Sequence, residues 1–256
     1  MTIVLEAHGV MGNERDYRAR IADIAGRTGW YRVFGAGYKG HDFGLTLHSR
    51  DEIALFEEQL GVRLPNEYAA LLMETGSGAG PYYGLWTPGR ILVEVEIWNG
   101  IRLKKDGVPP SPSAPFPFQQ ADANEICSRQ KIDPSESLGR ATFPSDGCIP
   151  ICCEGCTFFS VLVTAGEQLG RVWSVNSDGW PKAEWRPGTR PPGWWPGLRL
   201  DGTYAPSEEP ESRFSPRYLP PPPMPPTFLQ WNESWLERVE TDLDDFRAYK
   251  ASDDLR

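Results

Sequence analysis

Apolar side chains recur every three or four positions in several stretches of the chain, and this period predicts amphipathic helices. The first predicted helix covers residues 13–28, with Asn13 as a candidate cap. A second begins at Ser49, because Ser49 and Glu52 have the spacing of a capping box. Gly61 is placed to end that helix in the left-handed conformation that glycine adopts easily.

The same period returns twice more. A third helix is expected to begin near Pro65, since proline is well tolerated in a first helical turn. Its buried side would consist of Tyr68, Leu71 and Leu72. The last predicted helix spans about 227–250, with Thr227 as its cap. Its apolar stripe comprises Phe228, Trp231, Trp235, Val239, Leu243 and Phe246.

Alternating and continuous apolar runs predict strands. Residues 82–86 are expected to form one strand, and residues 91–98 (ILVEVEIW) a half-exposed antiparallel strand. The alternation would place Glu94 and Glu96 together on one face of that strand. The opposite face would carry the apolar members of the run, which are Val93, Val95 and Ile97. Three consecutive strands are expected at 148–153, 157–164 and 170–176, the middle one buried on both faces.

Composition adds long irregular segments to this picture. The 256 residues include 26 glycines, 25 prolines and 10 tryptophans, which indicates much loop pinned to a core by aromatic side chains. A Pro/Ser-rich insertion is expected at 107–117, a short helix near 119–131, and a Pro/Trp-rich insertion at 177–226.

The net charge of −9 disfavours direct binding to nucleic acid and favours association with a basic partner. No apolar run has the length of a membrane span, and the first residues lack the pattern of a signal peptide. We therefore expect a cytoplasmic protein without a membrane partner. The odd number of cysteines, five, does not suggest a secreted disulfide framework.

Residues 53–85 (IALFEEQLGVRLPNEYAALLMETGSGAGPYYGL) carry a specific motif. A helix with Phe-Glu and Leu-Gly precedes Leu-Pro-x-x-Tyr at the start of a second helix, then a glycine turn and an aromatic segment. The motif consists of Phe56, Glu57, Leu60, Gly61, Leu64, Pro65, Tyr68, Gly76, Gly78 and Tyr83. This block resembles the SUKH superfamily, also called the Smi–Knr family. Two further blocks are similar to its central hairpin and terminal helix: 143–148 with 170–173, and 228–236.

The resemblance implies an α+β fold in which helices flank one side of a central, mostly antiparallel or mixed sheet. It implies a SUKH-like domain over 49–256, with the insertions at 107–117 and 177–226, preceded by an N-terminal extension over 1–48. It also implies a non-enzymatic immunity protein without a cofactor, which binds and neutralises a cognate bacterial toxin by occluding it. Some relatives are scaffold or regulatory proteins, and that alternative remains open.

A cysteine cluster is the main indication of other chemistry. Cys148, Cys152, Cys153 and Cys156 could supply four thiolates to a structural zinc ion. On an extended strand, however, neighbouring residues point to opposite faces, and the first and second cysteines would lie roughly 13 Å apart. We therefore favour buried, unreactive thiols over a metal site. A metal-dependent enzyme is the second alternative to toxin binding.

Aromatic and acidic side chains near the middle of the chain are the candidate partner-binding residues. Rigid aromatic residues with a charged rim are typical of interface anchors. The candidates are Tyr82, Tyr83, Trp86, Glu94 and Glu96. A purely core role for Trp86 is the competing interpretation.

Overall fold

The computed structural model describes residues 14–27, 33, 35–36, 41–118, 146–155, 158–176, 181–182 and 225–253. In chain order they form α1 (Glu14–Gly26), β1 (Leu45–Thr46), α2 (Arg50–Leu60), α3 (Asn66–Glu74), β2 (Ser77–Gly78), α4 (Pro88–Asp106), β3 (Cys148–Gly155), β4 (Phe158–Val163), β5 (Val172–Asn176), β6 (Pro181–Lys182) and α6 (Phe228–Asp253). A block of helices precedes a block of antiparallel strands and a final helix follows, so the α+β prediction is confirmed.

The larger sheet has the strand order β3-β4-β5-β6, and every neighbouring pair is antiparallel. The first three strands match the three that the apolar runs predict. Residues 160–163 of β4 are buried, because both faces of this central strand are covered. A second sheet contains only β1 and β2.

Helices α2 and α3 form where the capping signals place them. The Ser49 hydroxyl accepts the Glu52 N–H at 3.2 Å, and the Glu52 carboxylate accepts the Ser49 N–H at 2.7 Å. Gly61 ends α2 with a φ of 68°. The Glu57 carboxylate then accepts the Leu64 N–H at 2.8 Å, which fixes the turn into α3.

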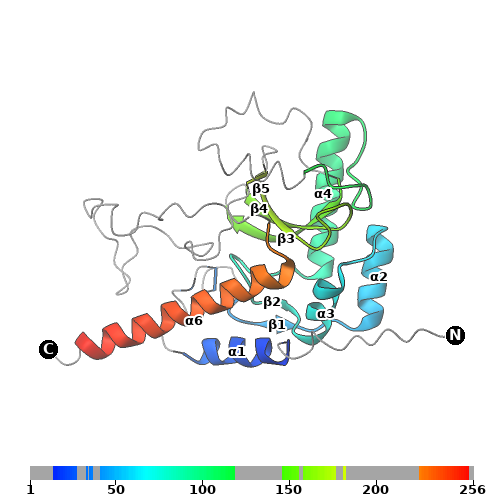
Figure 1. Cartoon of the computed structure of the whole chain (residues 1–256). Helices are drawn as coiled ribbons and strands as arrows, with labels where there is room; N and C mark the ends of the chain where they lie inside the picture. The colour runs from blue at the N-terminus through cyan, green and yellow to red at the C-terminus, as the bar shows by residue number, and fades with distance from the viewer. Residues whose placement is uncertain are drawn as a thin grey trace, which may run out of the picture.

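The main core lies between the helices and one face of the larger sheet. Ile149, Ile151 and Leu162 point from this face toward a cluster that includes Phe56 and Tyr68. The other face is also covered. Its cluster consists of Trp98, Phe116, Phe118, Cys148, Val161, Val163, Trp173 and Val175. Figure 1 shows α4 alongside the sheet, with α2 and α3 below it and the long α6 crossing the molecule.

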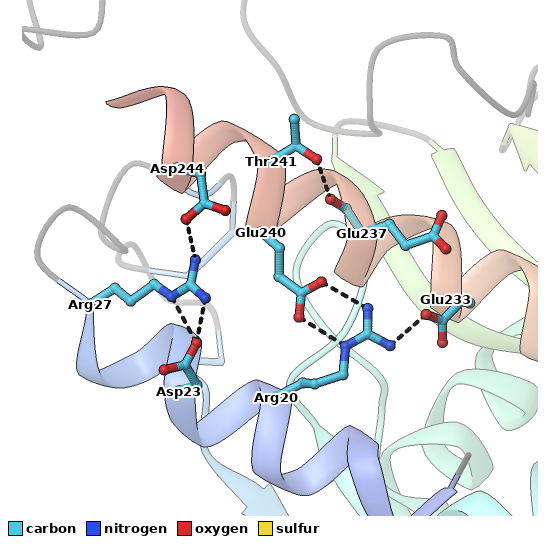
Figure 2. A network of polar contacts seen from close by, with 8 residues as sticks. All are labelled: Arg20, Asp23, Arg27, Glu233, Glu237, Glu240, Thr241 and Asp244. Carbon is cyan, nitrogen blue, oxygen red and sulfur yellow. Dashed lines mark hydrogen bonds and ion pairs between the residues drawn. The ribbon is translucent and has the colours of Figure 1, made fainter. Parts of the chain in front are cut away.

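Helix α6 also holds α1, through a third apolar cluster and a set of ion pairs. Buried Ile21 and Ile24 of α1 share this cluster with Trp235 of α6. Above it, the Arg20 guanidinium donates to both carboxylate oxygens of Glu240, at 2.8 and 2.9 Å, and also to Glu233. Figure 2 shows this network and its second centre at the end of α1. There Arg27 donates to Asp23 and, at 2.9 Å, to Asp244.

Two strand predictions are wrong. Residues 91–98 belong to α4, a 19-residue helix capped by the Thr87 hydroxyl and ended by Gly107 at a φ of 76°. Residues 82–86 form a turn and an irregular segment, with an isolated bridge between Leu85 and Gly78. Caps and 3.6-residue periodicity over the whole segment therefore outweigh the alternation within eight residues.

Several predicted features lie outside the described residues. They are the short helix at 119–131, most of the segment at 177–226, Asn13, Cys156 and the side chain of Phe246. The insertion at 107–117 is described and consists of turns and irregular backbone, without a helix or strand.

Candidate functional site

The segment 82–86 lies along the edge of β3 that no other strand of the sheet covers. The Tyr83 N–H donates to the Cys153 carbonyl at 3.3 Å, and the Trp86 N–H donates to the Ile151 carbonyl at 2.9 Å. Two backbone hydrogen bonds thus satisfy part of an edge that would otherwise be open to pairing with another chain. They also fix the positions from which both aromatic side chains project.

The turn before Trp86 contains two residues with positive φ angles. Tyr82 has a φ of 53°, which non-glycine residues rarely adopt, and Gly84 has a φ of 89°. A Cβ atom on Gly84 would lie 2.1 Å from the Gly78 carbonyl oxygen, so only glycine fits there without a backbone shift. The Cys152 thiol donates to the Pro81 carbonyl at 3.1 Å and ties the turn to the sheet. Tyr82 and Tyr83 are half-buried in this arrangement.

Trp86, Arg90 and Glu94 form a stack at the start of α4. The Arg90 guanidinium lies 5.1 Å from the centre of a Trp86 ring, a cation–π distance. Its Nη2 lies 3.1 Å from Oε2 of Glu94. The Arg90 side chain is 53% exposed, whereas the Glu94 side chain is only 9% exposed. The exposed charged group of this stack is therefore the cation, and the buried carboxylate orients it.

The other side of Trp86 packs on the sheet. Its ring meets Phe159 edge-on at 6.0 Å, and Phe159 meets Trp98 in the same manner at 5.9 Å. Trp86 is half-buried, so it belongs to the core on one side and is accessible on the other. One side of Trp86 thus packs against the core, and its role in an interface stays a prediction.

The predicted pairing of Glu94 and Glu96 on one strand face is wrong. Both residues lie on α4, where positions two apart point in different directions. Glu94 is buried against Arg90, and Glu96 is exposed. Glu94 and Glu96 therefore do not form the carboxylate pair that acid–base catalysis would need. Arg90 is not among the residues that the sequence pattern predicts for the site, although Thr87-Pro88 upstream carries the signal of a helix start.

The thiols of β3 have the environment of unreactive cysteines. Cys148 and Cys152 are buried and Cys153 is half-buried, and none of the three forms a disulfide. Burial raises the pKa of Cys152 well above its ordinary value and also raises the pKa of Cys153. A raised pKa reduces the thiolate fraction on which nucleophilic attack and metal ligation depend. Within the described residues, no group of three or more His, Cys, Asp or Glu side chains is arranged to hold a metal ion.

Glu154 is a further residue that sequence analysis missed. Its carboxylate accepts the hydroxyls of Ser160 and Ser174, both at 2.8 Å. These serines face each other on β4 and β5, so one carboxylate from β3 joins three strands. The role supported by these contacts is structural.

None of the helices in the described part of the chain combines the length and the apolar run that a bilayer crossing requires. The model of the SMI1 / KNR4 family (SUKH-1) matches residues 48–187, which is more than half of the chain. Comparisons with curated proteins and with solved structures found no match. The matched region contains the stack at the start of α4 and all four strands of the larger sheet, whereas α1 and α6 lie outside it.

Proposed function

Because this chain belongs to the SMI1 / KNR4 family (SUKH-1), we propose that it is a cytoplasmic immunity protein that binds a cognate bacterial toxin domain and neutralises it by occlusion. The family is generally associated with immunity proteins that are not enzymes. The match over residues 48–187 is the observation that carries the proposal. Within that region, Trp86 and Arg90 are residue types that protein interfaces favour, which supports the proposal.

The stack at the start of α4 is the proposed anchor for the toxin. Interface hot spots are enriched in Trp, Tyr and Arg. Arg90 is already held in place by Trp86 and Glu94, so less side-chain entropy is lost when a partner binds it. Tyr82 and Tyr83 lie on the adjoining turn, and exposed Glu96 follows on α4. We propose that these residues together provide a polar and aromatic surface of the kind that proteins recognise.

Overall charge supports the choice of partner. A net charge of −9 accelerates encounter with a positively charged domain and opposes contact with a phosphate backbone. We therefore propose a basic toxin domain as the partner, with no direct contact to nucleic acid. Occlusion requires only that the complex cover the toxin's active surface, and no cofactor takes part.

The test is titration calorimetry with the toxin domain encoded beside this gene, together with survival of cells that produce both proteins. We expect a 1:1 complex and protection from the toxin. Arg90→Ala should weaken binding at least about 10-fold, as expected for a hot-spot arginine. Arg63→Ala is the matched control, because it removes an exposed arginine from another part of the surface, and it should leave the dissociation constant unchanged.

Absence of both binding and protection would overturn the proposal. If the chain instead forms a complex with a non-toxic protein, it would be a scaffold or regulator of the same fold. The identity of the neighbouring gene separates these two functions before any protein is purified.

A further inference from the structure

Exposed apolar side chains gather on α4. Val93, Ile97 and Ile101 are 49%, 48% and 44% exposed. They are four residues apart, so they form one line along the helix, which we term the α4 ridge. Leu103 and Val108 extend the exposed apolar surface at the C-terminal end of the helix.

The ridge is unusual because the other side of α4 is already apolar and buried. Ile91 and Trp98 are 0% and 3% exposed and pack into the two cores that flank the sheet. A surface helix normally carries polar side chains on its outer side, whereas apolar side chains all round indicate burial on both sides. Exposed apolar patches of this kind mark interaction sites.

Local helix stability does not account for the residue types of the ridge. Val and Ile have lower helix propensity than straight-chain residues, because the preceding turn restricts their χ1 rotation. The same stiffness means that little side-chain entropy is lost when they are covered. The residue types thus favour contact with a partner over exposure to water.

Basic groups stand at both ends of the ridge. Arg90 lies three residues before Val93, and Lys104 lies three residues after Ile101, and both are exposed. Over 14 residues of helix the two cations are separated by roughly 20 Å. A complementary surface would therefore be apolar, with a carboxylate toward each end.

The charges argue against a second copy of this chain as the occupant. In an antiparallel pair of α4 helices centred on Ile97, Arg90 of each copy would face Lys104 of the other. In a parallel pair, each cation would face its own equivalent. Both arrangements bring like charges together at the ends of the contact, which is unfavourable.

We propose that the α4 ridge is the apolar centre of the toxin-binding surface, where it receives an apolar patch of the toxin domain bordered by carboxylates. This inference rests on the proposed function and continues the anchor at Trp86 and Arg90 along the helix. The ridge is smaller than the ~800 Å² per partner of a standard interface, so neighbouring polar residues supply the rim. Gly100, whose Cβ position has no atom within 4 Å, leaves room for close approach beside the ridge.

The test measures the dissociation constant of the complex with the purified toxin domain for three variants. Ile97→Asp should weaken binding at least about 30-fold, because it places a charge in the apolar centre. Lys104→Glu should weaken it about 5-fold at low salt and less at high salt, as expected for a charge at the rim. Leu169→Asp changes another exposed apolar residue, 56% exposed in the β4–β5 turn, and should leave binding unchanged.

Circular dichroism and thermal unfolding establish whether each variant is folded. If Ile97→Asp is unfolded, the milder Ile97→Ser takes its place in the binding measurement. Hydrogen exchange of the wild type then also measures whether the toxin domain protects the backbone amides of residues 93–104. Tight wild-type binding with no effect of ridge variants, or no protection of 93–104, would refute the inference and leave the proposed function standing. Absence of binding by the wild type would refute both this inference and the proposed function. A wild-type dimer in analytical ultracentrifugation that Ile97→Asp abolishes would assign the ridge to a second copy and overturn the inference.

Discussion

At Gly84 the backbone conformation decides whether Tyr83 and Trp86 can reach the edge of β3. The positive φ of this residue and the 2.1 Å approach of the Gly78 carbonyl to its Cβ position both require glycine. The glycine-rich run before it predicts a turn, but a sequence pattern does not show which carbonyl oxygen closes against which glycine. That contact depends on β1, β2 and the 82–86 segment meeting in space.

Gly84→Ala should lower the free energy of unfolding by about 2 kcal/mol or more, because it combines a strained φ with a backbone clash. Urea unfolding followed by tryptophan fluorescence measures the change. Gly89→Ala is the matched control, since no atom lies within 4 Å of its Cβ position and it sits in the first turn of α4. That control should be neutral or slightly stabilising, because alanine favours helix over glycine. Equal losses in both variants would contradict the argument.

His41 is a second residue whose environment only the structure shows. Its Nδ1 accepts the Phe43 N–H at 3.0 Å, and its ring meets those of Phe43 and Trp235 edge-on. Burial lowers the pKa of His41 from 6.5 to about 4. The neutral ring is thus favoured in the folded protein, whereas the unfolded chain binds a proton more readily.

The sign of the resulting pH dependence follows from this difference. The contribution of His41 to stability should be fully present above about pH 6.5 and be lost as the pH falls toward 4, by at most about 1.4 kcal/mol per pH unit. Burial also lowers the pKa of His48, opposed by Glu52, so that residue adds a slope of the same sign. Urea unfolding between pH 7.5 and 4.5 should show a smaller slope for His41→Gln than for the wild type. Parallel curves for the two proteins would contradict the predicted linkage.

Helix α4 shows where element prediction from this sequence succeeds and fails. The alternation in 91–98 satisfies a strand pattern, and its β-branched residues favour that interpretation. The cap at Thr87 and the stop at Gly107 favour a helix instead, and they agree with the buried positions Ile91 and Trp98 seven residues apart. The alternation of 91–98 does not decide between strand and helix, because Val93 and Ile97 are apolar although they are exposed, whereas Val95 packs against the core.

Helices α2, α3 and α6 could be predicted almost to the residue, because their caps and apolar stripes agree. The candidate site could be predicted only in part. Trp86 lies where a partner can reach one side of it, but the buried state of Glu94 follows from its contact with Arg90 on a helix. The pairing of α1 with α6 was not predictable, since their side chains meet across more than 200 residues of chain.

That pairing yields a prediction for Arg20. Its side chain is 17% exposed and contacts Glu233 and Glu240. Arg20→Ala should lower the free energy of unfolding by about 1–2 kcal/mol, less than for a fully buried pair because water still screens these groups. The stability of Arg20→Lys should lie between that of the wild type and that of Arg20→Ala, since lysine keeps the charge but cannot donate to both oxygens of Glu240 with Arg20's geometry. Urea unfolding provides the measurement. Arg18→Ala, an exposed arginine of the same helix, is the control and should change stability by less than about 0.5 kcal/mol.

At the scale of the whole molecule, the acidic and apolar surfaces occupy different elements. Carboxylates are frequent on the exposed faces of α2 and α6, whereas the exposed side of α4 carries the apolar ridge between two cations, with Glu96 beside it. We expect the two kinds of surface to control different steps of binding. The net charge of −9 should set the rate of encounter with the proposed partner, and the proposed contact on α4 should set the lifetime of the complex.

The salt dependence of binding kinetics tests this division. Between 50 and 500 mM NaCl, the association rate constant with the toxin domain should fall about 10-fold or more, because salt screens the attraction between opposite net charges. The dissociation rate constant should change much less, since apolar contacts are insensitive to screening. Removing two exposed charges of α2, with Asp51→Asn and Glu58→Gln, should slow association without altering dissociation. Association that is indifferent to salt, or faster at high salt, would show that the partner is not positively charged, and stopped-flow fluorescence of the tryptophans distinguishes these outcomes.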